Sequence, residues 1–256
     1  MRKLILFAGI MAAPFVGCFS QNIEKLIDTS FVCIESGNYV CAEEALKKAL
    51  HIYPQSGQLL ASLANIQAKL GKKDEALLAY CAALVRLPDD ATVLLGRAAL
   101  YAEMDSMNAS VADYRAAAAI EPDNEQALYA LGLIAIEQKD TAMARSYFER
   151  IMQASPQNAS GYAGLGMLHR LSGDLNQAEA FFSEALRLTP SYASARLQRA
   201  EVYFELNKNN KALEDVNAYL QLFPSDKYAY LLRGKIKLQL WEKDSADSDF
   251  QKANEL

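Results

Sequence analysis

Six prolines follow one another at an unbroken interval of 34 residues: Pro54, Pro88, Pro122, Pro156, Pro190 and Pro224. Proline breaks a helix interior, because it lacks the amide hydrogen and its ring clashes with the preceding turn. The stretch 173–190, GDLNQAEAFFSEALRLTP, contains a turn, an amphipathic helix pattern and then a proline stop. A fixed period of this length is typical of chains that stack one small unit many times. We therefore expect an array of helical units.

Seven rows of sequence align when they are counted from Ile23 in steps of 34 residues: 23–56, 57–90, 91–124, 125–158, 159–192, 193–226 and 227–256. Position 8 of every row is Ser, Ala or Gly, and position 20 is Ala or Ser. Two helices can approach closely where such small residues face each other. Position 24 is bulky throughout: Leu46, Tyr80, Tyr114, Phe148, Phe182, Val216 and Phe250. Each row is predicted to form two helices, joined by a turn such as Gly173-Asp174.

This pattern resembles the tetratricopeptide repeat, a 34-residue unit of two antiparallel helices with small, aromatic and proline residues at fixed offsets. The resemblance covers about residues 23 to 256. It implies an all-α fold, an α-solenoid of about seven helical hairpins in a right-handed superhelix. The polar stretch 244–256, with one apolar stripe, is expected to cap the last hairpin.

The first 20 residues are predicted to be a signal peptide, which leaves residues 21–256 as the solenoid. Two basic residues precede an apolar run, 4–17, and small and polar residues lead to Gln21. The net charge is −5, and loss of the leader makes the chain more acidic. Acidity argues against nucleic acid and anionic membranes as partners. We expect an exported protein, periplasmic or outer-membrane-associated in a Gram-negative bacterium.

A second cleavage site competes with the one before Gln21. The run Phe15-Val16-Gly17-Cys18 resembles a bacterial lipobox, in which Cys18 would be acylated. Helical periodicity begins by about Ile23, so a lipid on Cys18 would have a tether of only about four residues, roughly 15 Å at most. Cleavage before Gln21 is therefore the preferred hypothesis, and a membrane is a partner only if Cys18 is lipidated.

The other cysteines are Cys33, Cys41 and Cys81. Cys33 and Cys41 flank the first predicted turn, and an exported chain meets an oxidising compartment, so a disulfide between them is allowed. The alternative is that they are two small buried thiols. The sequence leaves this question open.

Charged residues recur in a correlated way in three rows. Position 7 is arginine and position 23 is aspartate in rows three, six and seven only: Arg97 with Asp113, Arg199 with Asp215, and Arg233 with Asp249. Each pair places one residue on each helix of a hairpin. We predict three copies of an inter-helix ion pair, against the alternative of solvated surface charges.

Residues suited to catalysis or metal binding are missing from the pattern. The two histidines, His51 and His169, have no neighbours at metal-ligand spacing, and no phosphate-binding glycine loop occurs. We predict no enzyme activity and no cofactor. Three Asp-Ser/Thr-aliphatic stretches resemble bacterial O-glycosylation acceptors, with Ser106, Thr141 and Ser245 as the hydroxyls, although Asp-Ser and Asp-Thr are also good helix N-caps.

A partner-binding groove is predicted from positions 2, 5, 9 and 12 of the first helices, on the inner, concave side. Its residues are Ile27, Phe31, Asn65, Leu95, Tyr129, Leu133, Ile136, Met167, Arg170, Leu197, Glu201, Phe204 and Lys235. The groove is apolar in the early rows and carries charge in the late rows, which suits an amphipathic helix or an extended peptide with a polar end. The alternative is that these apolar residues pack neighbouring first helices together. The family's peptide-carboxylate clamp needs Lys and Asn at defined groove positions; only Asn65 matches it, and the lysines that the clamp requires are absent.

These features predict a non-catalytic interaction scaffold or adaptor of the bacterial cell envelope, which binds a peptide or helix of another protein in its groove. The alternative hypothesis is a lipid-anchored structural subunit of an outer-membrane assembly, pilus or secretion machine. The two differ at Cys18, which only the second requires to be acylated.

Overall fold

The computed structural model of the chain describes residues 17–256, with side chains from Asn22 onward. These residues form fourteen α-helices and no strand. The helices are α1 Gly17–Glu35, α2 Tyr39–Ile52, α3 Gly57–Lys69, α4 Lys73–Arg86, α5 Ala91–Glu103, α6 Met107–Ile120, α7 Glu125–Glu137, α8 Thr141–Ala154, α9 Ala159–Leu171, α10 Leu175–Leu188, α11 Ala193–Glu205, α12 Asn209–Leu222, α13 Lys227–Gln239 and α14 Lys243–Glu255. Successive helices pack in pairs, which confirms the predicted all-α array of seven hairpins.

Proline ends the second helix of six hairpins. Each of the six periodic prolines directly follows the C-cap residue of an even-numbered helix; Pro88, for example, follows Leu87 at the end of α4. The first helices end differently. Their chain turns through a left-handed residue at position 15 of every row: Gly37, Gly71, Asp105, Lys139, Gly173, Asn207 and Trp241. Two backbone bonds close each of these turns, as in the Schellman motif; the amide of Glu242, for example, donates to the carbonyl of Lys237.

Short polar side chains begin most of the helices. The side chains of Asn38, Ser56, Asp90, Asn124, Asp140, Asn158, Asp174 and Asp226 each accept a hydrogen bond from a backbone amide in the first turn of the helix that they precede. Such a cap satisfies one of the free amides of the first turn. Helix stops therefore recur at the repeat period, and eight helix starts have a side-chain cap, whereas α4, α6, α11, α12 and α14 begin without one.

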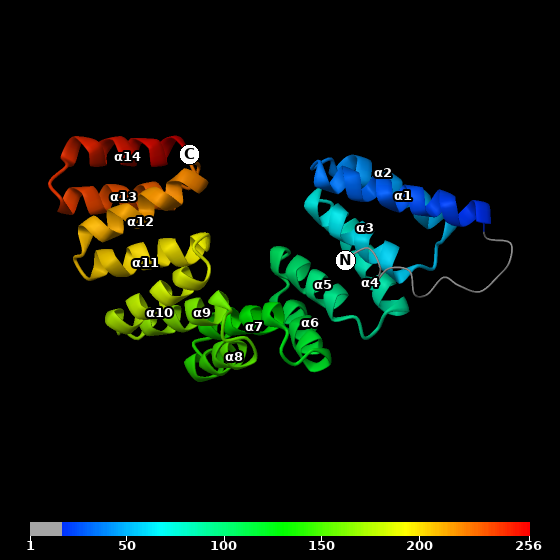
Figure 1. Cartoon of the computed structure of the whole chain (residues 1–256), viewed down its shortest axis with the longest axis horizontal. Helices are drawn as coiled ribbons and strands as arrows, with labels where there is room; N and C mark the ends of the chain where they lie inside the picture. The colour runs from blue at the N-terminus through cyan, green and yellow to red at the C-terminus, as the bar shows by residue number, and fades with distance from the viewer. Residues whose placement is uncertain (1–16) are drawn as a thin grey trace. The chain divides into compact units, whose positions relative to one another are not determined.

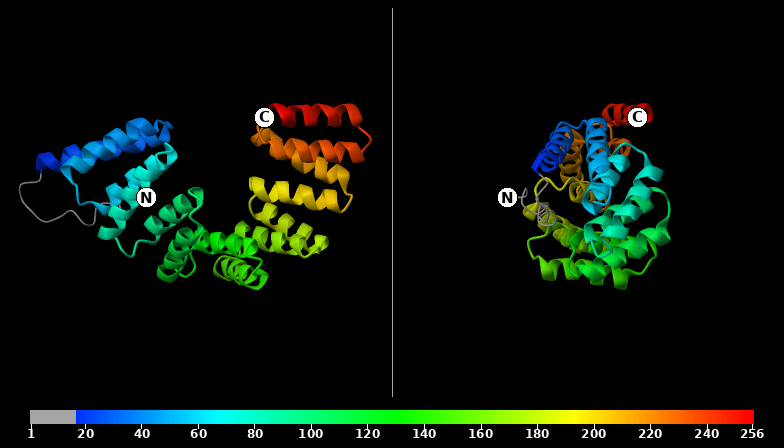
Figure 2. Two further views of the ribbon diagram at one scale, coloured as in Figure 1. Left: turned by 180° about the vertical axis from the view of Figure 1, so that it is seen from behind. Right: turned by 90° about the vertical axis from the view of Figure 1, so that its right-hand side faces the viewer.

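The hairpins group into two compact units, one ending at Pro122 and one running from Asp123 to Leu256. Figures 1 and 2 show hairpins stacked one after another within each unit, most clearly α11 to α14. First helices of successive hairpins touch: α3 contacts α5 in the first unit, and in the second unit α9 contacts both α7 and α11, which contacts α13. These contacts place the first helices side by side, so their exposed residues share one face within a unit.

Small residues lie where the two helices of each hairpin cross. Position 20 is completely buried in all seven rows: Ala42, Ala76, Ser110, Ala144, Ala178, Ala212 and Ala246. The bulky position 24 fills the space beside them, and Tyr80, Phe148 and Phe182 are among the largest fully buried side chains. Close approach is strictest around Phe148, because a Cβ atom at Gly132 or Gly164 would lie 2.5 or 2.3 Å from its ring.

The first hairpin departs from the others in two ways. Helix α1 begins at Gly17, not near Ile23, so its helical backbone includes the last residues of the predicted signal peptide; residues 1–16 of that peptide lie outside the described residues. A disulfide joins Cys33 at the end of α1 to Cys41 at the start of α2, with their Cα atoms 5.8 Å apart. Of the two alternatives for Cys33 and Cys41, a disulfide or two buried thiols, the structure has the disulfide. Cys81 is a free thiol.

All three predicted inter-helix ion pairs are present. The arginine Nε lies 2.7 Å from Asp113 in the third hairpin, 2.7 Å from Asp215 in the sixth and 2.9 Å from Asp249 in the seventh. In each case the second contact comes from Nη2, so the pairing is bidentate. The aspartate side chains are only 5–9% exposed. These are partly buried clips between helices rather than solvated surface charges.

Candidate partner-binding face

In the first unit, the predicted groove residues have unequal access to solvent. Phe31 is 50% exposed and Asn65 is exposed, whereas Ile27 packs against the first core cluster and Leu95 is buried at 5% exposure. Asn65 is also occupied, because its carbonyl accepts a 2.6 Å hydrogen bond from the Tyr80 hydroxyl. Leu95 therefore serves the core, and this unit offers only isolated accessible groove positions.

In the second unit, most of the predicted residues are half-buried on the shared face of the first helices. They pack with one side against the core clusters and keep the other exposed: Tyr129, Leu133, Ile136, Met167, Leu197 and Phe204. Lys235 is exposed on α13. Each of these side chains therefore contributes to packing and still presents surface. We call this set of positions on α7, α9, α11 and α13 the first-helix face.

A pocket of about 600 Å³ opens at one end of the first-helix face. It is lined by residues of α7, α9 and the N-cap of α11: Asn124, Glu125, Gln126, Tyr129, Ala130, Leu133, Ser160 and Tyr192. The ring of Tyr129 leans on Phe148, with 5.7 Å between ring centroids, and its hydroxyl accepts a bond of 3.5 Å from Tyr192. Burial, and secondly the neighbouring Tyr192, raise the pKa of Tyr129. The phenol is therefore neutral at physiological pH.

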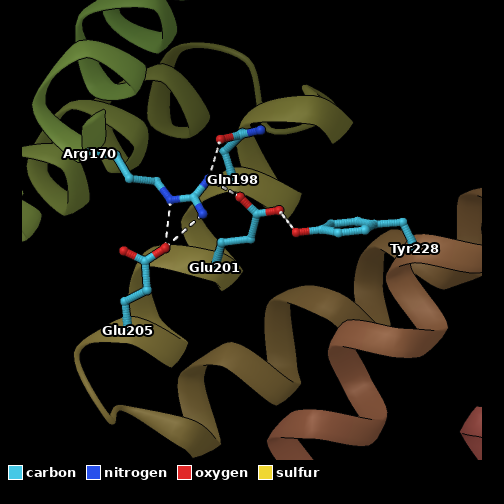
Figure 3. A network of polar contacts seen from close by, with 5 residues as sticks. All are labelled: Arg170, Gln198, Glu201, Glu205 and Tyr228. Atoms are coloured by element: carbon cyan, nitrogen blue, oxygen red, sulfur yellow. Dashed lines mark hydrogen bonds and ion pairs between the residues drawn. The ribbon is translucent and has the colours of Figure 1, made fainter.

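A polar network lies on the same face, between α9, α11 and α13 (Figure 3). Arg170 donates to three acceptors on one side of α11: Gln198 at 3.1 Å, Glu205 at 2.7 and 2.8 Å, and Glu201. Tyr228 of α13 donates to the other carboxylate oxygen of Glu201. One arginine and one phenol thus link three successive first helices.

The network satisfies a carboxylate that would otherwise be costly to bury. The side chain of Glu201 is 6% exposed, and an unpaired buried carboxylate is strongly disfavoured. Burial, and then its hydrogen bond to Glu201, raise the pKa of Tyr228 to about 12, so the phenol keeps its proton and stays a donor. Because one arginine faces two glutamates, the network keeps a net negative charge. Glu205 is its more exposed carboxylate, at 37%.

Sequence reasoning named Arg170 and Glu201 but did not connect them. It assigned position 2 to the groove without naming Tyr228 there, and it missed Gln198 and Glu205. The members of this network lie at positions 12, 6, 9, 13 and 2 of three consecutive rows, 27 to 35 residues apart. A comparison of each row with the next, at these offsets, is the signal that would have found them.

The remaining predicted sites are placed as follows. Ser106 and Thr141 are exposed at the starts of α6 and α8, and Ser245 is half-buried in the first turn of α14. Asp140 caps α8 by accepting from the amide of Met143 at 2.9 Å. The side chain of Cys18 lies outside the described residues.

Within residues 17–256, no helix is long and apolar enough to cross a bilayer, and no three potential ligand side chains gather as a metal site.

Comparison with known proteins identifies the family. Models described as tetratricopeptide repeat match residues 34–92, 93–159, 135–187 and 169–236. The crystal structure of a tetratricopeptide repeat protein from Parabacteroides merdae is 32% identical, with a TM-score of 0.72, and the match covers 92% of this chain and 93% of that one. The chain belongs to the tetratricopeptide repeat family.

Two further solved structures share the fold at lower identity. One is PilW, described as a widely conserved type IV pilus biogenesis factor, at 20% identity and a TM-score of 0.68, covering 86% of this chain and 99% of that chain. The other is PilF from Pseudomonas aeruginosa, at 20% identity and a TM-score of 0.51, covering 90% and 89%. A comparison with curated protein sequences found no match.

Proposed function

We propose that the protein is a non-catalytic scaffold that holds a peptide or helix of a partner protein on the first-helix face of its second unit. The observation that carries this proposal is the placement of a pocket, half-buried apolar side chains and a polar network on consecutive first helices. Apolar anchors provide most of the energy of such an interface, and surrounding polar groups fix the register of the bound segment. The fold itself supports a protein-interaction role.

We place this scaffold in the cell envelope. The basic, apolar and small segments of residues 1–20 are those of an export signal. The Cys33–Cys41 disulfide supports export independently, because disulfides persist in oxidising compartments and are rare in the cytosol.

Site-specific photo-cross-linking in the bacterium that encodes the protein tests the binding face. A photoreactive amino acid replaces Met167 on the first-helix face or, as the control, Gln153, which is exposed on α8. We expect a discrete cross-linked protein from position 167 and none from position 153. Equal labelling at both positions, or labelling from position 153 alone, would show that the partner does not use the first-helix face.

A second candidate is a lipid-anchored structural subunit of an outer-membrane assembly, pilus or secretion machine. It is favoured by the lipobox-like run ending at Cys18 and by the likeness to a pilus biogenesis factor over nearly all of that protein's length. Intact mass of the native protein separates the candidates. A chain starting at Gln21 supports the scaffold without an anchor, and an acylated Cys18 supports the anchored subunit.

A further inference from the structure

We infer that the pocket at the start of the first-helix face receives a cationic side chain, arginine or lysine, from the bound segment. This inference rests on the proposed function and specifies which chemistry the partner presents there. It concerns the pocket of about 600 Å³ between α7, α9 and the N-cap of α11.

The charge of the pocket is the first argument. Glu125, exposed in the first turn of α7, is the only carboxylate among its lining residues, and no Lys, Arg or His lines it. The adjoining pocket, of about 500 Å³, shares Glu125 and likewise has no basic lining residue. Two arginines on neighbouring elements have other partners. Arg150 of α8 forms an ion pair of 3.3 Å with Asp123, and Arg196 of α11 donates to the carbonyl of Pro190 and lies 3.8 Å from Asp215. The lining of the pocket therefore has one acidic side chain and no basic one.

The lining groups are the second argument. Two phenol rings stand at the pocket, and Tyr129 is held in place by its contact with Phe148. The hydroxyls of Tyr129 and Tyr192 lie 3.5 Å apart, and a hydroxyl oxygen has two lone pairs, so this contact leaves each oxygen able to accept from a bound cation. An aromatic face beside a carboxylate is the arrangement that attracts guanidinium and ammonium groups, and the planar guanidinium suits it best because it can stack on a ring.

The apolar part of the pocket is the third argument. Ala130 and Leu133 continue from the pocket along α7, so a long side chain can lay its methylene groups on them while its charged end reaches Glu125. Arginine and lysine have this division into an apolar stem and a charged end. An acidic segment would meet the carboxylate of Glu125 and is disfavoured on the same grounds.

The test uses the full chain with ¹³C-labelled tyrosine rings and three short probes. Acetyl-Leu-Arg-amide, acetyl-Leu-citrulline-amide and acetyl-Leu-Glu-amide are each titrated to the limit of solubility while the Tyr129 and Tyr192 resonances are followed by NMR. Citrulline keeps the shape of arginine without its charge. We expect the arginine peptide to shift both tyrosines and to bind about three- to fivefold more tightly than the citrulline peptide, with the glutamate peptide weakest.

Matched variants locate the effect. Glu125→Gln should remove the preference for arginine over citrulline, whereas Glu137→Gln, which changes an exposed glutamate at the other end of α7, should leave it intact. Thermal unfolding of both variants should match that of the unchanged chain.

Equal binding of the three peptides, no tyrosine shift with any of them, or a preference that survives Glu125→Gln would overturn the inference. The proposed function fails separately. If position 167 still cross-links a partner while the arginine and citrulline peptides bind alike, the first-helix face remains the binding surface and only the cation preference falls.

Discussion

The same place in the hairpin is filled in two chemically different ways. Hairpins three, six and seven place an arginine at position 7 and an aspartate at position 23, whereas hairpins two, four and five place a leucine at position 7 and an alanine, tyrosine or phenylalanine at position 23. In hairpin five, Leu165 and Phe181 belong to one hydrophobic cluster. In hairpin six, Arg199 and Asp215 form a bidentate ion pair. The backbone is a helical hairpin in both cases, so the fold does not require either chemistry.

The ion-paired hairpins make one contact that the apolar ones cannot make. The third nitrogen of each arginine reaches back to position 25 of the preceding row: to Cys81 at 3.5 Å, to Ser183 at 3.1 Å and to Asn217 at 2.9 Å. Each arginine therefore joins three helices, two in its own hairpin and one in the preceding hairpin. Directional bonds of this kind fix the register of neighbours, whereas apolar contacts tolerate small displacements. The arginines thus make directional bonds between successive hairpins, which the apolar residues at the same positions cannot make.

The largest effect is expected from removing one partner of an ion pair. Asp215→Ala leaves Arg199 partly buried without its carboxylate, and also deprives Arg196, 3.8 Å away, of its counter-charge. Loss of one member of a buried pair costs about 3 to 5 kcal/mol, because the remaining charge stays desolvated. Chemical denaturation should show the loss in the free energy of unfolding. The control is Glu214→Ala, which removes a neighbouring exposed glutamate. Equal stability of the two variants would mean that the pair is solvated.

A smaller loss is expected when the ionic arrangement is moved into an apolar hairpin. Leu165→Arg with Phe181→Asp places the pair in hairpin five, where Phe181 stacks on His169 with 5.1 Å between ring centroids. The double variant loses this packing and desolvates two charges, so we expect the free energy of unfolding to fall by about 2 to 3 kcal/mol. If the double variant is as stable as the unchanged chain, positions 7 and 23 of hairpin five accept an ion pair as well as an apolar pair.

Acidification should weaken the seventh hairpin, whose ion pair contains Asp249. Burial alone would raise the pKa of Asp249, but hydrogen bonds from Arg233 and Lys237 outweigh burial and hold the pKa below its ordinary value of 3.8. A depressed folded-state pKa gives stability that is present above 3.8 and is lost as the pH falls through the folded-state value.

Melting temperatures of the unchanged chain and of Asp249→Asn, measured from pH 7 downward, test this directly. The difference in melting temperature between the two proteins should become smaller below about pH 4. A constant difference would contradict the assignment of the depressed pKa to this ion pair.

Much of this architecture could be predicted from the sequence because the residues that determine it repeat every 34 positions. The prolines, the small residues at positions 8 and 20 and the Arg–Asp correlation each repeat in phase, so a single row can be checked against six others. The left-handed residue at position 15 could not be predicted in the same way, because its residue type varies from row to row. Gly37 and Gly173 suit a left-handed turn, but Trp241 adopts the same conformation, with φ of 65°, and is 93% exposed, which no turn propensity predicts.

The candidate site was less predictable because it depends on contacts between rows. Arg170 and Tyr228 reach the same glutamate from hairpins on either side of it, and nothing repeats this arrangement elsewhere in the sequence. Leu95 was assigned to the groove by its position, yet it is buried, because position alone does not say how much of a side chain its neighbours cover. Likewise, the sequence allowed the Cys33–Cys41 disulfide but could not choose between it and two thiols.

The smallest effect is expected from replacing an ion pair with the apolar pair of another hairpin. Arg97→Leu with Asp113→Tyr gives hairpin three the residues that hairpin four has at Leu131 and Tyr147. Replacing a buried ion pair with apolar side chains is often neutral or stabilising, so the free energy of unfolding should change by about 1 kcal/mol or less. The loss of the bond from Arg97 to Cys81 should instead appear locally, as faster hydrogen exchange where α4 meets α5. Unchanged exchange there would mean that the arginines do not hold neighbouring hairpins in register, and a large loss of global stability would mean that the ion pairs are themselves a main source of stability. In the first case the ion pair and the apolar pair would be interchangeable. In the second case the two kinds of hairpin would differ in stability and not in how they stack.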